Sequence, residues 1–283
     1  MLENVVIGNE LGLEKIKSRF VKDGASKLHI LADFDKTLTK AFVNGKSVPS
    51  MISILRDGNY LTKEYVEKAR ALSEKYYPIE VDPKIPLEEK KEVMRKWWTE
   101  HFNLLIKSKL NKKDIEKVVN SGKVELREGC LEFLDLLHKQ DIPLIIMSSS
   151  GLGRESISRY FEKYNKLHKN IYIISNEFEW DKEGYLIRVE EPIIHAMNKD
   201  ETLIKNFPIF DIIKNKKNVI LLGDNIEDTG MVEGFDYNNL IKIGFLNESI
   251  EENLKYYKKA YDILILNDFD MKYVSNLLRE IIS

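Results

Sequence analysis

Two carboxylates near the N-terminus directly follow an apolar segment: Asp33 and Asp35 come after residues 28–32. Side chains at positions i and i+2 of an extended segment point to the same side, so the two carboxylates are expected to share one site. Like charges held close together repel unless a cation or a proton lies between them, and oxygen-rich sites suit Mg²⁺. The pair predicts magnesium-assisted chemistry, although a bare Asp-x-Asp pattern is more often a turn after a strand.

Two later apolar segments also end in polar residues. Residues 142–147 are followed by Ser148–Ser150, and residues 218–223 are followed by Asp224. Continuous apolar runs are typical of buried strands in parallel sheets, and ligands bind beyond the carboxyl ends of such strands. A phosphate monoester needs a nucleophile, a proton donor, a cation and donors around its phosphoryl oxygens. Together these strand ends predict a site for phosphate chemistry.

The segments that must position these residues alternate in character along the chain. Strands are predicted at residues 28–33, 142–147, 171–175, 218–224, 240–245 and 262–266. Helices are predicted at residues 9–23, 129–140, 151–164, 200–206 and 269–282. Turns or hairpins are predicted at 39–47 and 177–190, which contain Asn44-Gly45 and Lys182-Glu183-Gly184. This alternation predicts an α/β fold with a doubly wound parallel sheet.

Residues 49–125 interrupt that alternation and contain no strong strand pattern. Helices are predicted at residues 60–76, 87–109 and 112–121, with Asp82-Pro83 and Pro86 between the first two. We therefore expect an inserted, mostly helical cap domain at 49–125, and a catalytic core made of residues 1–48 and 126–283.

Composition excludes some classes of protein. The chain has 283 residues, of which 43% are apolar, and a net charge of −2, so nothing in the charge balance favours nucleic acid or anionic membranes as partners. The single Cys130 excludes an internal disulfide framework. No apolar run approaches the ~20 residues of a membrane span, and the N-terminus lacks the features of a secretory signal. We expect a cytoplasmic monomer that acts on a small molecule.

Other cofactor sites find no support in the sequence. The five histidines and one cysteine show no paired spacing typical of zinc ligands. No Gly-x-x-x-x-Gly-Lys-Ser/Thr pattern is present, so an ATP-binding P-loop is not indicated.

The residues at the first and last of these strand ends resemble a known superfamily. They read Asp33-Phe34-Asp35-Lys36-Thr37-Leu38-Thr39 and Gly223-Asp224-Asn225-Ile226-Glu227-Asp228. These stretches resemble the first and fourth motifs of the haloacid dehalogenase (HAD) superfamily of aspartate-nucleophile phosphatases. The resemblance implies a HAD-like core in which Asp33 is the nucleophile and Asp35 protonates the leaving oxygen. It also implies that Mg²⁺ is held by Asp33, the Asp35 backbone carbonyl and Asp224, with Thr37 in a supporting position.

The same resemblance assigns the remaining motifs. Ser149 is the expected Ser/Thr of the second motif, with Ser148 as the alternative, and Ser150 follows it in the turn. Lys199 is the expected lysine of the third motif, and Asp228 would orient Lys199 or a metal-bound water. Ser149, Ser150 and Lys199 are thus expected to bind substrate. A serine run alone is usually a helix N-cap, and one lysine among many is usually exposed, so the prediction depends on the order of the whole set.

A closer resemblance lies in the cap. The residues are Tyr76-Tyr77-Pro78-Ile79-Glu80-Val81-Asp82-Pro83 and Trp97-Trp98-Thr99. They resemble the type III cytosolic 5′-nucleotidases, the pyrimidine 5′-nucleotidase family. The resemblance implies hydrolysis of nucleoside 5′-monophosphates such as UMP and CMP, with 7-methylguanosine monophosphate also compatible. It implies that Glu80 accepts hydrogen bonds from the base and that Trp98 stacks on it, whereas His101 stands where relatives commonly have Ser.

Three alternatives stay open at this point. An aspartyl phosphate can be captured by an alcohol, so a nucleoside phosphotransferase is one, and another small-metabolite phosphatase of the superfamily is the second. A phospho-receiver domain also uses an aspartate cluster with a Ser/Thr and a Lys. Receivers are far shorter, however, and have no inserted cap.

Overall fold

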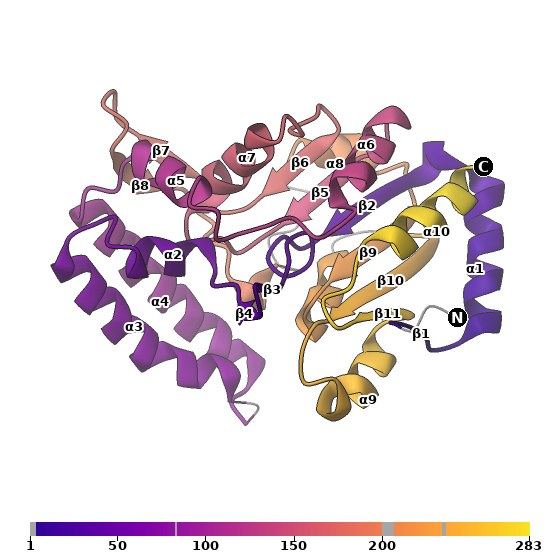
Figure 1. The fold of residues 1–283 in the computed structure, drawn as a ribbon, viewed down its shortest axis with the longest axis horizontal. Coiled ribbons are helices and arrows are strands. Elements are labelled where there is room, and N and C mark those ends of the chain that lie inside the picture. Colours follow the sequence, from indigo (N-terminus) through magenta and orange to yellow (C-terminus); the bar gives the residue numbers. More distant parts are fainter. Residues whose placement is uncertain (1–3, 83, 200–206, 234–235) are drawn as a thin grey trace.

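The computed structural model describes residues 4–82, 84–199, 207–233 and 236–283. At its centre lies a seven-stranded sheet in the order β1-β11-β10-β9-β2-β5-β6 (Figure 1). The strands are β1 (Val5–Ile7), β2 (Leu28–Ala32), β5 (Leu144–Met147), β6 (Ile171–Ile174), β9 (Asn218–Gly223), β10 (Asn239–Leu246) and β11 (Ile263–Leu266). Neighbouring strands run parallel, except that the edge strand β1 pairs antiparallel with β11. The predicted parallel sheet is confirmed, and β1 is an addition to it.

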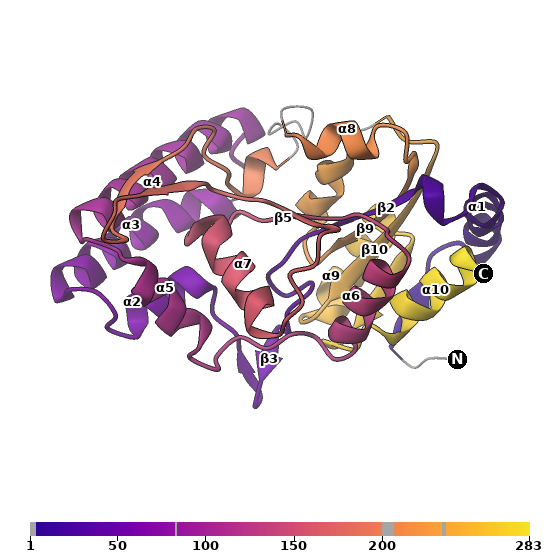
Figure 2. The same ribbon diagram turned by 90° about the horizontal axis from the view of Figure 1, so that it is seen from above.

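Helices cover both faces of the sheet, as a doubly wound fold requires. One hydrophobic cluster joins one face to α1 (Glu10–Asp23), α6 (Cys130–Lys139), α7 (Gly153–Lys163) and α10 (Lys272–Ile282). A second cluster joins the other face to α8 (Ile209–Ile213), the 3₁₀ segment η4 (Ile226–Val232) and α9 (Ile250–Ala260). Figure 2 shows α8 on one side of the sheet, and α6 and α10 on the other. The predicted fold class is confirmed, but α8 and α9 were not predicted.

Strand β2 determines where the residues that follow it, Asp33 to Asp35, lie in the fold. All five of its residues are buried, and successive side chains alternate between the two clusters: Ile30 lies in one and Leu31 in the other. A strand that is apolar on both faces belongs in the middle of the sheet, and β2 lies between β9 and β5. The residues that follow Ala32 are therefore delivered to the centre of the carboxyl edge.

Four helices between residues 51 and 119 gather at one end of the molecule (Figure 1). They are α2 (Met51–Asp57), α3 (Lys63–Val81), α4 (Leu87–Lys107) and α5 (Lys112–Val119). Helix α2 was not predicted. Helix α3 starts later than expected, because Thr62 caps it, and it runs on through Pro78 to Val81. Pro78 lies in the last turns of α3, where a missing N–H removes only one hydrogen bond of the helix.

Two small hairpins confirm the predicted turns. The strands β3 (Phe42–Val43) and β4 (Lys46–Ser47) are joined by Asn44-Gly45, both with positive φ (52° and 72°), as a two-residue hairpin turn requires. The strands β7 (Phe178–Trp180) and β8 (Leu186–Val189) form the second hairpin. Its backbone packs against the helical end, since the Leu186 N–H donates to the Leu110 carbonyl at 2.9 Å. A segment predicted in the core thus also supports the cap.

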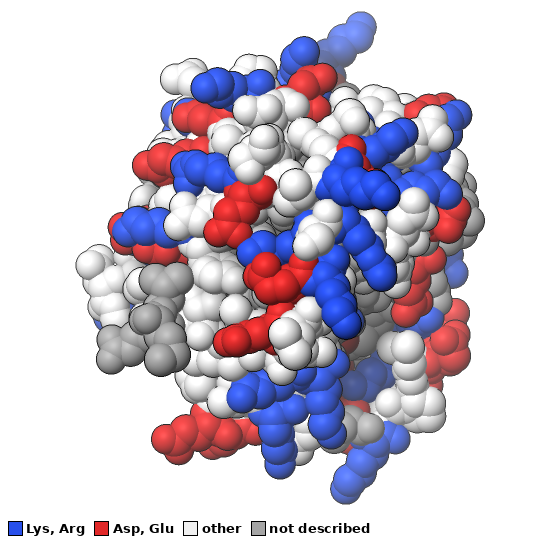
Figure 3. Space-filling model, turned by 90° about the vertical axis from the view of Figure 1, so that its right-hand side faces the viewer, with Lys and Arg blue, Asp and Glu red and all other residues white. Residues whose placement is uncertain are grey.

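The helix predicted at 200–206 lies outside the described residues. Among the helices that the structure describes, none combines the length and apolar character that crossing a bilayer requires. On the face seen in Figure 3, basic and acidic side chains are interleaved, in keeping with the small net charge.

Candidate active site

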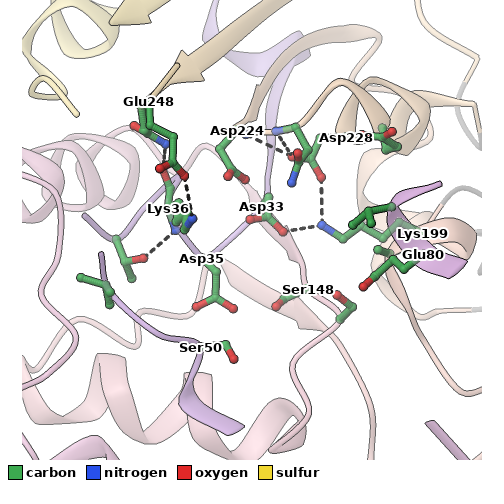
Figure 4. A pocket seen from close by; sticks show the side chains of 18 of the residues that line it. Asp33, Asp35, Lys36, Ser50, Glu80, Ser148, Lys199, Asp224, Asp228 and Glu248 are labelled. Carbon is green, nitrogen blue, oxygen red and sulfur yellow. Dashed lines mark hydrogen bonds and ion pairs between the residues drawn. The ribbon is translucent and has the colours of Figure 1, made fainter. Parts of the chain in front are cut away.

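Three neighbouring strands bring the predicted phosphate-site residues together. Asp33 follows β2, Ser148 follows β5 and Asp224 follows β9, and these strands are adjacent in the order β9-β2-β5. The Asp33 N–H still pairs with the Leu222 carbonyl at 3.0 Å, so the sheet itself holds the backbone of Asp33. Figure 4 shows the side chains of Asp33, Asp35 and Asp224 around one space. The structure therefore assembles what the sequence placed at separate strand ends.

Lys199 forms a buried ion-pair network with two of the aspartates. Its ammonium donates to Asp33 Oδ1 and, at 2.9 Å, to Asp228 Oδ1, and Lys199 is only 8% exposed (Figure 4). The second oxygen of Asp228 accepts the N–H groups of Asp224 and Asn225 at 3.1 and 3.0 Å. Asp228 thus orients both Lys199 and the loop that carries Asp224.

Burial sets the ionisation of this cluster. It raises the pKa of Asp33 to about 7, against the opposing effect of Lys199 and with the help of the neighbouring Asp228 and Asp35. Burial likewise raises the pKa of Asp35 and, well above its usual range, that of Asp224. Burial alone would lower the pKa of Lys199, but Asp228 and Asp33 together raise it. Four carboxyl groups lie around the Lys199 ammonium, so a further cation would relieve their mutual repulsion.

The donor set fits such a cation. Carboxylate oxygens of Asp33, Asp224 and Asp228 lie within 4.8 Å of one another, and hard oxygen ligands are those that Mg²⁺ prefers. The Thr37 hydroxyl lies 3.5 Å from Asp224 Oδ1, which places Thr37 beside the same group. The assignment of the ligands to Asp33, Asp224 and the Asp35 carbonyl stays a prediction.

The three serines of the turn after β5, Ser148–Ser150, have two different environments. Ser148 and Ser149 both line the cavity above Asp33, so the choice between them as the second motif stays open. The Ser150 hydroxyl instead lies 3.1 Å from the Ser156 hydroxyl and accepts the Leu152 N–H at 3.3 Å. Those contacts organise the start of α7, the role that serine runs commonly have.

Two adjacent cavities open from the site toward the cap. The larger, about 790 Å³, contains the aspartates and Lys199 and is bordered by Glu80 and Lys90. The smaller, about 410 Å³, is bordered by Trp98 and His101. Four residues line both cavities: Asp35, Ser50, Tyr77 and Ser149. The predicted base-recognition residues Glu80 and Trp98 therefore both lie within reach of the phosphate site, but on different cavities.

Trp98 belongs to an aromatic stack on the cap. Its ring lies 6.1 Å from that of Trp97 with 19° between the planes, and Trp97 stacks in turn on Tyr76. Both tryptophans are half-buried. Gly151 lies against Trp98, since a Cβ at position 151 would fall 2.8 Å from the ring. The glycine lets the serine turn of the core touch the cap.

Helix α9 carries supporting residues that sequence reasoning missed. The Tyr257 hydroxyl donates to the Asp224 carbonyl at 2.8 Å, and the Tyr261 hydroxyl donates to the Asn225 carbonyl. Both hydrogen bonds hold the loop that follows β9 and carries Asp224. The apolar spacing of Leu254, Tyr257 and Tyr261 is helical and was a usable signal for this helix.

Comparisons with known proteins agree with this geometry. The family model "Pyrimidine 5′-nucleotidase (UMPH-1)" matches residues 36–282. The chain is 36% identical over 271 residues to the 7-methylguanosine phosphate-specific 5′-nucleotidase of Homo sapiens, covering 95% of this chain and 90% of that protein. For the Gallus gallus protein of the same name the identity is 35% over 266 residues, covering 93% and 91%.

Solved structures give the same picture. The crystal structure of cytosolic 5′-nucleotidase IIIB bound to cytidine matches with a TM-score of 0.90 and 29% identity, covering 99% of this chain and 94% of that one. A substrate-bound phosphoserine phosphatase, at 19% identity and a TM-score of 0.51, shares the fold over 88% of this chain and 96% of that chain.

The sheet and its strand-end aspartates therefore define a phosphatase of the HAD class. Within that class, the chain belongs to the pyrimidine 5′-nucleotidase family, because the family model and relatives above 30% identity cover nearly all of it. The predicted superfamily, family and enzyme class, a 5′-nucleotidase, are confirmed. The roles of individual residues stay predictions.

Proposed function

We propose that this protein hydrolyses nucleoside 5′-monophosphates to nucleoside and inorganic phosphate through a phosphorylated Asp33. The observation that carries the proposal is the position of Asp33: it is 5% exposed, anchored to the sheet, paired with Lys199 and open to a cavity that extends to the cap. A nucleophile held this rigidly needs no rearrangement to reach a phosphorus atom.

The first half of the reaction phosphorylates the protein. A carboxylate oxygen of Asp33 attacks phosphorus, and the bond from phosphorus to the 5′ oxygen breaks. The Asp35 carboxyl group donates its proton to that oxygen as it leaves, and the raised pKa that burial gives Asp35 favours the protonated form. Lys199 and Ser149 donate hydrogen bonds to the phosphoryl oxygens, where charge develops in the transition state.

The second half regenerates the free carboxylate. The Asp35 carboxylate takes a proton from water, the water oxygen attacks phosphorus, and the bond between phosphorus and Asp33 breaks to release phosphate. Mg²⁺ at Asp33, Asp224 and the Asp35 carbonyl would neutralise phosphoryl charge next to these aspartates. Asp228 keeps Lys199 aimed at Asp33 throughout.

Base recognition falls to the cap in this proposal. Glu80 borders the larger cavity, where its carboxyl oxygens can accept hydrogen bonds from a base. Burial raises the pKa of Glu80 against the opposing effect of Lys90. Trp98 offers a ring to stack on the base. Pyrimidine nucleotides such as UMP and CMP are the proposed substrates, and 7-methylguanosine monophosphate is the second candidate because curated relatives carry that name. We also expect a cytoplasmic monomer.

A substrate panel with a trapping step tests the proposal. Purified protein with Mg²⁺ is assayed on UMP, CMP, GMP and 7-methylguanosine monophosphate, with and without an acceptor nucleoside that reveals phosphotransfer.

A trapping experiment tests the covalent intermediate. When the reaction with a nucleotide that carries a ³²P-labelled phosphate is quenched in acid, label should remain on the protein and be released by hydroxylamine, and Asp33→Asn should carry none. Inversion of configuration at phosphorus would show direct attack by water and overturn the covalent route. Size-exclusion chromatography checks the monomer.

A further inference from the structure

Arg127 is a fully buried cation that the mechanism above does not use. It lies between α5 and α6, 1% exposed, and it contacts a loop that precedes it by almost ninety residues. All four carbonyls of residues 36–39 accept a hydrogen bond from it. The backbone N–H donates to Leu38 O at 2.9 Å, Nε donates to Thr37 O at 2.8 Å, and Nη2 donates to Lys36 O and, at 3.4 Å, to Thr39 O.

The guanidinium is itself held from behind. Asp268 forms an ion pair with Nη1 at 2.9 Å, Nη1 donates to Phe269 O at 2.8 Å, and Nη2 donates to Asn247 Oδ1 at 3.1 Å. The ring of Phe245 lies 4.3 Å beneath it. Burying an arginine is unfavourable unless its charge and donors are satisfied, and here they are. Arg127 therefore cannot shift without breaking contacts on both sides.

The backbone of Lys36 shows what these contacts maintain. Lys36 has a φ of 58°, a left-handed conformation that is unfavourable for a residue with a side chain. Its N–H donates to Thr39 Oγ1 at 2.8 Å, and its carbonyl accepts from both Arg127 and Asn247 Nδ2, the latter at 3.1 Å. Hydrogen bonds on both sides of Lys36 thus hold the unfavourable conformation.

That conformation decides where the Asp35 carbonyl points. In a trans peptide the C=O of one residue points opposite to the N–H of the next, so the bond from the Lys36 N–H to Thr39 turns the Asp35 carbonyl away from Thr39. This carbonyl is the ligand assigned to Mg²⁺ above. We infer that Arg127 is a positioning residue for the reaction: it holds loop 36–39 so that the Asp35–Lys36 peptide presents its carbonyl to the cation.

The inference rests on the proposed function, and variants at three positions test it. Arg127→Met removes the guanidinium at similar length, and Arg127→Lys retains the charge with fewer donors. For Arg127→Met we expect kcat to fall about 10- to 100-fold on nucleotides and equally on p-nitrophenyl phosphate. The Mg²⁺ concentration for half-maximal activity should rise several-fold while KM for the nucleotide stays within about twofold, since the cap is untouched. For Arg127→Lys, kcat and the Mg²⁺ concentration for half-maximal activity should lie between the values for Arg127→Met and for the parent.

A readout without turnover separates positioning from general stability. In the metal-free protein, amide exchange of a peptide spanning residues 34–39 should be faster in Arg127→Met, while a peptide from β9 keeps the parent rate. The rise in Tm on adding Mg²⁺ should shrink. Arg188→Met, a surface change on the β7–β8 hairpin, is the matched control and should leave every one of these measurements unchanged.

Milder variants keep the inference falsifiable if Arg127→Met does not fold. Asn247→Ala removes one of the two side chains that donate to the Lys36 carbonyl, and Thr39→Val removes the acceptor of its N–H; both should raise the Mg²⁺ requirement. A parent-like Mg²⁺ requirement and loop exchange rate in the folded variants, with activity lost only in proportion to unfolded protein, would show that Arg127 is merely structural. An inactive parent enzyme would instead refute the proposed function.

Discussion

The phosphate site and the cap are built in different ways. The phosphate site combines side chains at the ends of three adjacent strands with Lys199. These groups are buried or half-buried: Asp33 is 5% exposed, Lys199 is 8% exposed, and Asp224 is half-buried. The cap residues come from the faces of α3 and α4 and remain accessible, with Tyr77 55% exposed and Trp98 half-buried. In the proposed mechanism, residues at the edge of the sheet therefore carry out the chemistry that all substrates share, and residues on the cap helices select among substrates.

The difference predicts two distinct kinds of defect. A change at the strand ends should affect every phosphate ester equally, because it acts on groups that all substrates share. A change on the cap should alter the order of preference among bases. Each experiment below compares a nucleotide with p-nitrophenyl phosphate, which has no base for the cap to bind.

The largest expected effect is that of Asp33→Asn. Removal of the nucleophile should lower kcat by about 10³-fold or more on both substrates, while nucleotide binding stays measurable because the cap is intact. Steady-state kinetics and equilibrium binding of a labelled nucleotide check this. A loss confined to the nucleotide would contradict the division between core and cap.

Removal of the cation should be nearly as severe. EDTA should abolish hydrolysis of both substrates and added Mg²⁺ should restore it, since the Asp33 and Asp224 carboxylates otherwise repel the phosphoryl group. Asp224→Asn should raise the Mg²⁺ concentration required for activity. Full activity in EDTA would exclude the proposed metal site.

Two buried histidines, one in each region, should make stability depend on pH. Burial lowers the pKa of His29 in β2 and of His101 in α4 from 6.5 to about 4; the hydrogen bond to the Lys216 carbonyl opposes this shift at His29, whereas Arg56 adds to it at His101. Between those values each histidine binds more protons in the unfolded chain, so its contribution to the free energy of unfolding is fully present above pH 6.5. It should fall as the pH drops toward 4, by at most about 3 kcal/mol for each histidine.

Two variants and two spectroscopic probes can assign the loss of stability at low pH to the core or to the cap. His29→Asn should reduce the loss in the core, and His101→Gln should reduce it in the cap. Trp97 and Trp98 lie in α4, so tryptophan fluorescence mainly follows the cap, whereas circular dichroism follows the whole chain. A Tm that is equally sensitive to pH in a variant and in the parent would show that the replaced histidine does not contribute.

The smallest expected effects belong to the cap. Trp98→Ala should raise KM for nucleotides, because the lost stacking weakens binding by a free energy on the order of 1 kcal/mol or somewhat more. The same change should barely affect hydrolysis of p-nitrophenyl phosphate. Glu80→Gln should alter the ranking of bases by a similar amount. An equal loss of activity on both substrates would mean that Trp98 and Glu80 stabilise the fold and do not recognise the base.

Much of the fold and of the phosphate site was predictable because its signals are local. The apolar run of β2 ends at Asp33, and that of β9 ends at Asp224, within a few residues of sequence. The Asn44-Gly45 turn is equally local, since two residues with positive φ are enough to define it. In each case the residue types that create the structure are neighbours in the chain, so composition and spacing determine the outcome.

Other features were decided only by tertiary structure. Lys199 pairs with Asp33 across 166 positions, and nothing in the residues around it distinguishes it from the other lysines of the chain. Arg127 contacts Lys36 across 91 positions, and the hairpin β7–β8 contacts the cap through a backbone hydrogen bond to Leu110 and through the rings of Phe178 and Phe102. Patterns along the chain determine which segments become strands and helices. Which distant side chains share a buried charge depends on how those segments pack, because the electrostatic energy that selects the partners exists only once water is excluded.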